Sequence, residues 1–237
     1  MEESGNESFQ GSVISTGQPQ IDKKLGGGIP CGSLTLIEGQ SDAGKSVFSQ
    51  QLVWGSLNGG HRAMLFTTEN TVRSFNVQMQ SIGLDILEYL LLNWLRIYCI
   101  ESSKSKDSAP FDIILREIDR QQSYDMIVVD SLTPFIIHNP LEDILSYFDQ
   151  CKRKCDRGKT VINVAHSYAF DENVLIRLRS VCDAHFRLHI EKVGNKLVRV
   201  LDVAKVRGAE QITGNSLSFE VEPGLGMQIM PFSKAKA

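Results

Sequence analysis

The stretch that decides the fold reads LTLIEGQSDAGKSVFS and runs from residue 34 to residue 49. Its first five residues, Leu34–Glu38, are mostly apolar, which is typical of a buried parallel strand. Gly39 then begins the pattern glycine, four residues, glycine, lysine, serine, the spacing of a phosphate-binding loop that opens a helix. A helical run, Val47–Leu57, follows directly. Because the pattern stands between a strand and a helix, it predicts a site for nucleotide phosphates.

Each position of this loop has a chemical reason. Gly39 and Gly44 let the backbone lie where a Cβ atom would clash, so that successive N–H groups can point at phosphate oxygens. Lys45 supplies a cation for the β- and γ-phosphates and Ser46 a hydroxyl for Mg²⁺, while the helix N-terminus adds its dipole. Asp42 is unusual beside a polyanion, and we expect it to face solvent or a neighbouring subunit. The predicted nucleotide contacts are Gly39, Gln40, Ser41, Asp42, Ala43, Gly44, Lys45, Ser46 and Val47.

The composition favours an ordinary globular chain. It has 237 residues, of which 42% are hydrophobic and 22% charged, and its formal net charge is −3. This length suits one α/β domain, which we place at residues 13–237 after a polar, flexible N-terminus at residues 1–12. The mild acidity argues against nucleic acid as a main partner, although a local basic patch remains possible.

Cysteines and hydropathy bear on the compartment. The five cysteines stand at positions 31, 99, 151, 155 and 182, an odd and scattered set without a further Cys or His pair at zinc spacing. This indicates reduced thiols in an intracellular protein. The first twelve residues are polar and acidic, unlike a signal peptide, and no run of about 18 apolar residues occurs. We therefore expect a cytoplasmic protein without a membrane span.

The remaining pattern alternates strands with helices. We expect strands at 34–38, 62–68, 124–130 and 160–166, and helices at 47–57, 71–82, 111–122, 140–156 and 171–180. Residues 14–33 predict a tight irregular entry, 87–100 a strand-rich stretch with a turn near Asn93, 102–110 a mobile loop, and 132–139 a loop or broken helix. Alternation at 184–192, 196–206, 216–221 and 227–231 predicts antiparallel strands. The fold class is therefore α/β, with a mostly parallel central sheet flanked by helices and an antiparallel β-rich C-terminal extension.

Two carboxylates follow predicted strands. Asp130 ends the apolar run at 126–129, where an acid can hold Mg²⁺ and its waters together with Ser46. The alternative is an N-cap for the next helix. Glu69 follows the strand after the phosphate loop, within reach of a γ-phosphate, and is the candidate to activate water. Its alternative role is a cap for the next helix through Thr71 or Val72.

Three further side chains are candidates for phosphate contact. His166, at another strand end, can sense a γ-phosphate or can be structural. Lys205 and Arg207 are spaced by two and so share one face of a strand. They can meet a phosphate in their own chain or across a subunit boundary, or they can form a solvated basic strand end.

The combination of segments resembles a known family. The carrying residues are TGQPQIDKKLGGGIPCGS (16–33), GQSDAGKS (39–46), FTTEN (66–70), MIVVDS (126–131) and KVRG (205–208). They resemble the RecA superfamily of P-loop NTPases and, within it, the KaiC-like ATPases. The resemblance implies a RecA-like core, ATP with Mg²⁺, a catalytic role for Glu69, and Lys205 and Arg207 touching the γ-phosphate of the next subunit in a hexameric ring.

Residues 162–188, INVAHSYAFDENVLIRLRSVCDAHFRL, together with FTTEN, resemble the archaellum (archaeal flagellum) motor-associated FlaH/ArlH family. This implies a regulatory ATP-binding ring at the inner face of the motor, contacting a motor ATPase and a membrane platform protein. It also implies weak or absent hydrolysis, in keeping with Glu69 being followed by Asn70 instead of a second glutamate. The alternative function is an active RecA-type ATPase acting on single-stranded nucleic acid.

Overall fold

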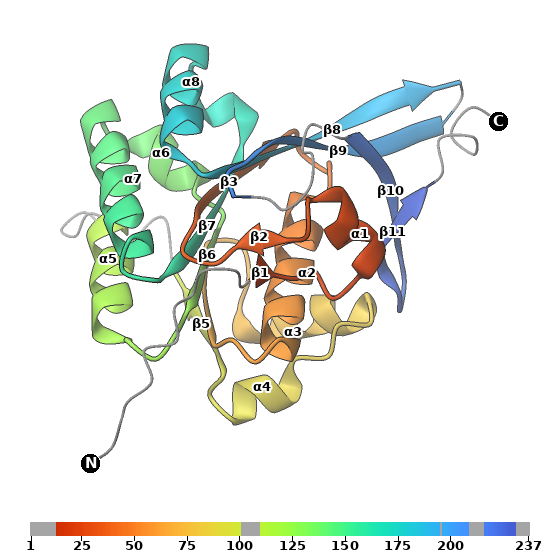
Figure 1. Ribbon diagram of the computed structural model, residues 1–237, viewed down its shortest axis with the longest axis horizontal. Helices are drawn as coiled ribbons and strands as arrows, with labels where there is room; N and C mark the ends of the chain where they lie inside the picture. Colours follow the sequence, from red (N-terminus) through yellow and green to blue (C-terminus); the bar gives the residue numbers. More distant parts are fainter. Residues whose placement is uncertain (1–12, 101–109, 195, 209–215, 231–237) are drawn as a thin grey trace.

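The computed structural model describes residues 13–100, 110–194, 196–208 and 216–230. One nine-stranded sheet runs through it in the order β11-β10-β9-β8-β3-β7-β6-β4-β5 (Figure 1). Its parallel strands are β3 (Leu34–Gly39), β4 (Ala63–Thr67), β5 (Leu95–Cys99), β6 (Met126–Asp130), β7 (Thr160–His166) and β8 (Ala184–Val193). Antiparallel pairing adds β9 (Lys196–Val206), β10 (Ser216–Glu222) and β11 (Gly226–Met230). The predicted fold class is confirmed.

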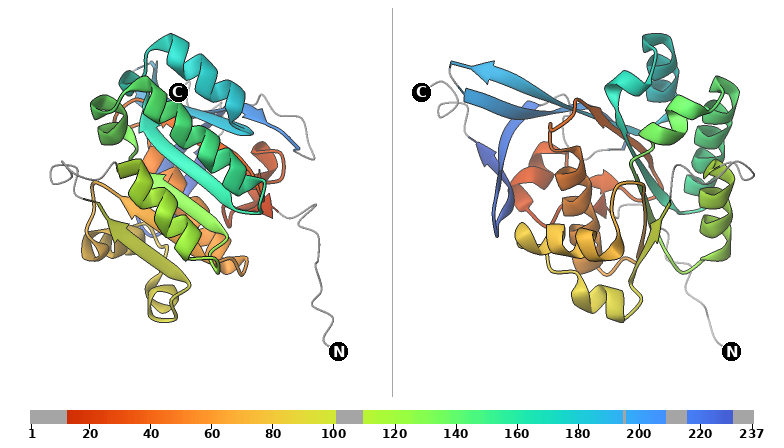
Figure 2. Two further views of the ribbon diagram at one scale, coloured as in Figure 1. Left: turned by 90° about the vertical axis from the view of Figure 1, so that its left-hand side faces the viewer. Right: turned by 180° about the vertical axis from the view of Figure 1, so that it is seen from behind.

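Helices cover both faces of the parallel strands, as the two views in Figure 2 show. One face carries α2 (Lys45–Asn58), α3 (Val72–Ser81) and α4 (Leu87–Leu91); the other carries α5 (Pro110–Arg120), α6 (Thr133–His138), α7 (Leu141–Cys155) and α8 (Glu172–Val181). In β6, Met126 and Val128 pack into the first layer, whereas Ile127 and Val129 pack into the second. A strand buried on both faces needs apolar residues at every position, which explains the continuous apolar runs in the sequence.

The N-terminal leader is fastened to α2. It forms β1 (Val13–Ile14), α1 (Pro19–Lys24) and β2 (Ile29–Pro30), with β1 and β2 paired. A Cβ atom on Gly55 of α2 would lie 2.1 Å from the carbonyl oxygen of Ser15, so only glycine admits the leader this closely. Gln51 Nε2 also donates to the carbonyl of Thr16 over 2.8 Å. The leader therefore packs against the helix that the phosphate loop opens, and it is more regular than the irregular entry we expected.

Residues 87–100 and 133–138 differ in part from the structure predicted for them. The stretch 87–100 is not strand throughout, because its first half is the short helix α4. The predicted turn near Asn93 is confirmed, since that residue has φ 57° and separates α4 from β5. Residues 133–138 form one short helix with Pro134 in its first turn, where a missing N–H does no harm. Residues 1–12 and 101–109 lie outside the described part of the chain, so the predictions made for them stay predictions.

The C-terminal strands leave the body and return to it. The β8–β9 hairpin projects from the globular core, and β10 and β11 curl back towards α2 and α1 (Figures 1 and 2). Phe219 of β10 and Met227 of β11 join the same apolar cluster as Phe48 and Leu52 of α2. The antiparallel extension therefore closes over the helix that begins at Lys45.

Candidate functional site

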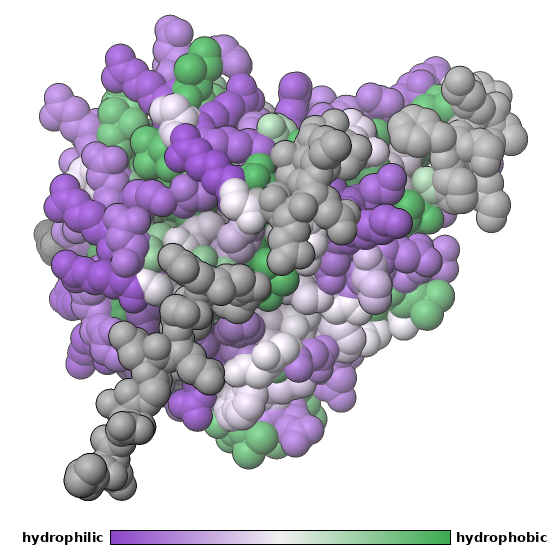
Figure 3. All heavy atoms as spheres, viewed as in Figure 1, coloured by the Kyte–Doolittle hydropathy of each residue, from purple (hydrophilic) through white to green (hydrophobic). Residues whose placement is uncertain are grey.

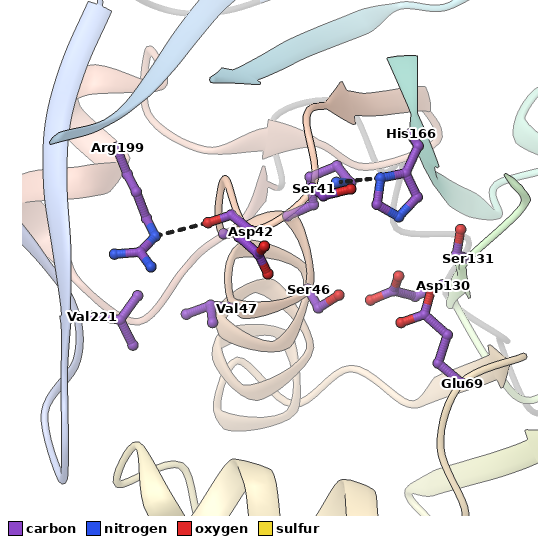
Figure 4. A pocket seen from close by; sticks show the side chains of 12 residues that line it. Ser41, Asp42, Ser46, Val47, Glu69, Asp130, Ser131, His166, Arg199 and Val221 are labelled. Carbon is purple, nitrogen blue, oxygen red and sulfur yellow. Dashed lines mark hydrogen bonds between the residues drawn. The ribbon is translucent and has the colours of Figure 1, made fainter. Parts of the chain in front are cut away.

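A pocket of about 500 Å³ opens at the carboxyl edge of the parallel strands. In open α/β sheets this edge is where ligands bind. Twelve residues line it, and they come from the phosphate loop and the start of α2, from the ends of three parallel strands and from two antiparallel strands (Figure 4). They are Ser41, Asp42, Gly44, Lys45, Ser46, Val47, Glu69, Asp130, Ser131, His166, Arg199 and Val221.

Both loop glycines are required by geometry. Gly44 has φ 93°, a left-handed conformation, and it precedes α2 without any side-chain cap on the helix N-terminus. A Cβ atom on Gly39 would lie 2.1 Å from the carbonyl oxygen of Leu188 in β8. The first N–H groups of a helix have no partner within it, and here no capping side chain takes their place. The start of this 14-residue helix is therefore a suitable site for an anion.

Lys45 is held inside the loop. Its Nζ donates to the carbonyl of Gln40 over 2.6 Å and lies 3.2 Å from Nδ1 of His166. Burial lowers the pKa of Lys45, and the charge of Asp130 acts in the opposite direction, followed by that of Glu69. Among the described residues, the hydrogen-bond partners of this ammonium group are a carbonyl and an imidazole, and the carboxylates act on it through their charge, so a phosphate would add a directly bound anion.

Two carboxylates stand at one end of the pocket. The pairing of Thr67 with Asp130 brings the ends of β4 and β6 together, and Glu69 follows β4 (Figure 4). Burial raises the pKa of Asp130 to about 6, and the nearby charge of Glu69 adds to that rise against the opposing hydrogen bond from Ser49. A buried acid whose charged form is this costly gains from a cation beside it.

The alternative roles of these acids do not apply in this structure. Helix α6 has Leu132 at its N-cap position, so Asp130 does not cap it. Helix α3 is capped by Thr71, whose side chain exchanges hydrogen bonds with Ser74. Glu69 instead lines the pocket.

His166 ends β7 and faces the loop lysine. Burial and the charge of Lys45 lower its pKa. With Nδ1 accepting from Lys45, the neutral ring carries its proton on Nε2. His166 can therefore donate a hydrogen bond to a ligand from this nitrogen, which is the property that a phosphate sensor requires.

The cation that reaches the pocket from the antiparallel strands is Arg199, which the sequence reading missed. Its Nε donates to the carbonyl of Asp42 over 3.0 Å, while the Asp42 side chain is exposed (Figure 4). Alternation predicts that β9 is a strand, but no signal in the sequence identifies which of its basic residues lies beside the loop.

Lys205 and Arg207 lie elsewhere. Lys205 pairs with His185, which pairs with Leu36, so both cations stand near the amino edge of β3 and outside the pocket lining. Lys205 Nζ donates to the carbonyl oxygens of Arg179 and Cys182, and Arg207 donates to that of Ser180. In a single chain they cap the C-terminal end of α8, where positive charge stabilises a helix.

The donor set fits a magnesium ion. Ser46 offers a hydroxyl and Asp130 a carboxylate, the oxygen ligands that Mg²⁺ prefers, and the rest of its shell is normally water and phosphate. Burial raises the pKa of Asp130 although the charge of Lys45 opposes this, so a further cation beside the carboxylate would stabilise its charged form. These two residues would hold the ion, which supplies positive charge beside the β- and γ-phosphates when bound.

None of the helices in residues 13–100, 110–194, 196–208 and 216–230 has the length and apolar character of a membrane span.

Solved structures of other proteins share this fold. A crystal structure of the flagellar accessory protein FlaH from Methanocaldococcus jannaschii matches with a TM-score of 0.79 at 26% identity, covering 92% of this chain and 98% of that one. A KaiC-like protein of Pyrococcus horikoshii OT3 matches with a TM-score of 0.76 at 20% identity over 93% of this chain, a likeness of fold. The predicted RecA/KaiC-like fold is confirmed.

Sequence comparison gives the family. The archaeal flagellar ATP-binding protein FlaH of Sulfolobus acidocaldarius is 31% identical over 231 residues, which is 95% of this chain and 100% of that protein. The protein of the same name in Methanocaldococcus jannaschii is 28% identical over 91% of this chain. The family model described as "ATPase: KaiC" matches residues 14–234. The chain therefore belongs to the KaiC family of ATPases and, within it, to the family of the archaeal flagellar ATP-binding proteins FlaH.

Proposed function

We propose that this protein binds ATP with Mg²⁺ and serves the archaellum motor as a regulatory, nucleotide-dependent assembly component. The observation that carries the proposal is the uncapped start of α2 with Lys45 beside it, inside a pocket of about 500 Å³. Binding of a triphosphate would replace the carbonyl of Gln40 as the partner of Lys45. The name "ATP-binding protein" carried by the FlaH relatives supports ATP as the nucleotide.

The two ends of the pocket differ in charge, and this difference favours one direction of the ligand. Glu69 and Asp130 lie at one end, whereas Arg199 and Val221 lie at the other (Figure 4). A triphosphate directed at Lys45 and Ser46 would place its γ-phosphate near Glu69 and His166. The nucleoside would then lie towards Arg199 and Val221, where a planar cation and an apolar side chain can cover a base.

Asp130→Asn is expected to remove most of the benefit of Mg²⁺ for ATP binding. In the wild-type protein, calorimetry should show binding that strengthens at least about tenfold when Mg²⁺ is added, because hydrogen bonds from the waters of the ion to a charged carboxylate contribute roughly 1.5–3 kcal/mol each. The variant should bind ATP without Mg²⁺ about as well as wild type does. No heat of binding from wild-type protein with ATP and Mg²⁺ would overturn the proposed function. An unchanged Mg²⁺ effect in the variant would remove Asp130 from the metal site.

Glu69 supports slow hydrolysis at most. It is the one acidic side chain at the end of β4 next to the pocket, and Asn70 occupies the position of a second carboxylate. A neutral amide cannot take a proton from water, so one general base serves the reaction. We therefore expect tight ATP binding with little phosphate release. Brisk turnover stimulated by single-stranded DNA would instead favour a nucleic-acid ATPase, an alternative that the net charge of −3 does not favour.

Assembly into a ring, which we take as a hexamer, would add a phosphate contact to the role of Lys205 and Arg207 in capping α8. They lie at the amino edge of β3, so only the pocket of another copy is available to them.

Exposed apolar side chains on α4 and just after it offer a surface for other proteins (Figure 3), and they are Leu87, Leu91 and Leu92. The motor ATPase and the membrane platform protein of the archaellum are the partners that we propose, at the inner face of the motor.

Arg207→Ala is expected to weaken ATP-dependent assembly at least about tenfold while leaving ATP binding by dilute protein unchanged. Removing one charge-assisted phosphate contact per interface gives an effect of that order. Mass photometry over a range of concentrations measures assembly, and calorimetry measures binding. Arg120→Ala, which removes an arginine side chain that is 69% exposed, is the matched control and should change neither. Equal assembly by the Arg207 and Arg120 variants would contradict a trans-acting role.

We further propose that residues 13–237 act as one nucleotide-binding unit. The nine-stranded sheet, which contains every strand from β3 to β11, and the close packing of the leader on α2 support this.

A further inference from the structure

Three reactive side chains meet at the edge of the sheet opposite the nucleotide pocket. His61 lies two residues before β4 and Asp125 lies one residue before β6. Because Ala63 pairs with Met126, the starts of these two strands are neighbours. The imidazole Nδ1 of His61 lies 3.6 Å from Oδ2 of Asp125, an ion-pair distance.

Cys31 reaches the same place from the leader. It follows β2, and the next residue, Gly32, donates its N–H to Thr160 Oγ1 over 3.0 Å. Thr160 in turn donates its own N–H to the carbonyl of Asp125 over 2.8 Å. These two backbone hydrogen bonds hold the three segments together. The side chain of His61 forms a hydrogen bond with the side chain of Cys31 and also contacts Asp125. Cys31, His61 and Asp125 are therefore arranged in space as a nucleophile, a base and a carboxylate that orients the base.

The neighbours of His61 favour the cationic form of its imidazole. Contact with Asp125 and then with Cys31 raises the pKa of His61 to about 9, against the opposing effect of burial. Lys159 is a further charged group here, and it acts on Asp125, whose pKa is lowered chiefly by His61. An imidazolium beside a thiol favours the thiolate, which is the nucleophilic form of cysteine.

The other described cysteines lack this setting. Burial raises the pKa of Cys151 and of Cys182 to about 12 and raises that of Cys155 as well, so these three stay protonated and shielded. Cys99 is exposed at the end of β5. Cys31 is half-buried, and its partner side chains His61 and Asp125 are 18% and 37% exposed, so a small reagent can approach the trio.

We propose that Cys31 is a nucleophilic thiolate and a site of modification by low-molecular-weight disulfides. The Cys31 thiolate attacks one sulfur of the disulfide, a new S–S bond forms, and the old S–S bond breaks. The other half leaves as a thiolate and takes a proton from water, so no separate oxidant is required. His61 and Asp125 are positioning residues. His61 holds positive charge beside the sulfur, and Asp125 orients the His61 ring.

This site is distinct from the nucleotide pocket. Strand β3 leads from Leu34, near Cys31, to Gly39, where the phosphate loop begins. Five steps along a strand span roughly 16 Å. A small group on Cys31 therefore leaves the pocket open, and modified protein should bind ATP as unmodified protein does. The absence of ATP binding would count against the proposed function without touching this inference.

The test is the rate at which hydroxyethyl disulfide modifies each cysteine of the native full chain. Trypsin places all five cysteines in separate peptides, so mass spectrometry follows them individually. At pH 7 Cys31 should react at least about tenfold faster than the exposed Cys99, because an imidazolium lies beside Cys31. Between pH 6.5 and 8 the Cys31 rate should change little and should stay above the Cys99 rate.

His61→Gln is expected to slow Cys31 at least about tenfold and to make its rate rise steeply with pH. Cys99 serves as the internal control for folding, because its rate should not change. Asp125→Asn is the second variant and should slow Cys31 by a smaller factor, since it leaves the imidazole in place with a lower pKa. A wild-type Cys31 that reacts no faster than Cys99 overturns the inference, and so does an unchanged Cys31 rate in a folded His61→Gln protein.

Discussion

Replacing Glu38 by glutamine is expected to lower the free energy of unfolding by about 3–5 kcal/mol, the loss found when one partner of a buried ion pair is removed. Glu38 is 1% exposed and lies in β3, directly before the phosphate loop. Its Oε1 lies 2.7 Å from Arg179 and 3.2 Å from Nε2 of His185, and Ser167 donates to Oε2. Without the carboxylate, the guanidinium of Arg179 keeps its burial but loses its closest anion.

Urea unfolding of wild type and variant at pH 7 measures this difference. Glu172→Gln is the matched control, because Glu172 contacts the same Arg179 over 3.3 Å but is 74% exposed. Exposed pairs of this kind contribute no more than about 1 kcal/mol. If Glu38→Gln costs no more than Glu172→Gln, the buried network does not stabilise the fold.

The same network predicts the pH dependence. Burial alone would raise the pKa of Glu38, but the hydrogen bonds from His185, Ser167 and Arg179 outweigh it and lower the pKa to about 2 from 4.5. A lowered folded-state pKa gives a contribution that is complete above the unfolded value and is lost as pH falls towards the folded value. The stability gap between wild type and Glu38→Gln should therefore stay constant from pH 7 to about 5 and narrow below about pH 4.5.

Lys45→Ala is expected to reduce ATP affinity at least about 100-fold while leaving the protein folded. The lysine would exchange its contact with the Gln40 carbonyl for charge-assisted bonds to phosphate, each of which contributes roughly 1.5–3 kcal/mol. A factor of 100 corresponds to about 2.7 kcal/mol. Calorimetry with ATP and Mg²⁺ measures the change.

Lys159→Ala is the matched control for this experiment. Lys159 also caps backbone carbonyls, those of Gln122 and Tyr124, each over 2.7 Å, but it lies outside the pocket. Its loss should lower stability and leave ATP affinity unchanged. If the Lys45 variant bound ATP as tightly as wild type, the assignment of the phosphate loop would be wrong.

Local signals in the sequence predict the parallel core well, and non-local contacts explain what they miss. The strand predicted at 160–166 coincides with β7, and the predicted loop helix differs from α2 by two residues at its start and one at its end. Glu38 is different, because its partners Arg179 and His185 are 141 and 147 positions away and no spacing rule links them. Likewise Lys205 lies in β9, but Arg207 lies one residue beyond its end, so the predicted shared strand face is not formed, and the end of α8 that both cap is visible only in three dimensions.

Arg199 has a consequence for how motion could reach the nucleotide. It lies three residues after Lys196, the first residue of β9 beyond the turn of the projecting hairpin, and it holds the Asp42 carbonyl. Phe219 touches the same loop from the next strand, since a Cβ atom on Gly44 would lie 2.9 Å from its ring. Arg199 therefore links the projecting β8–β9 hairpin directly to the phosphate loop. A partner bound at the tip of the hairpin would act on the nucleotide through this contact, and a bound nucleotide would act on the partner by the same route.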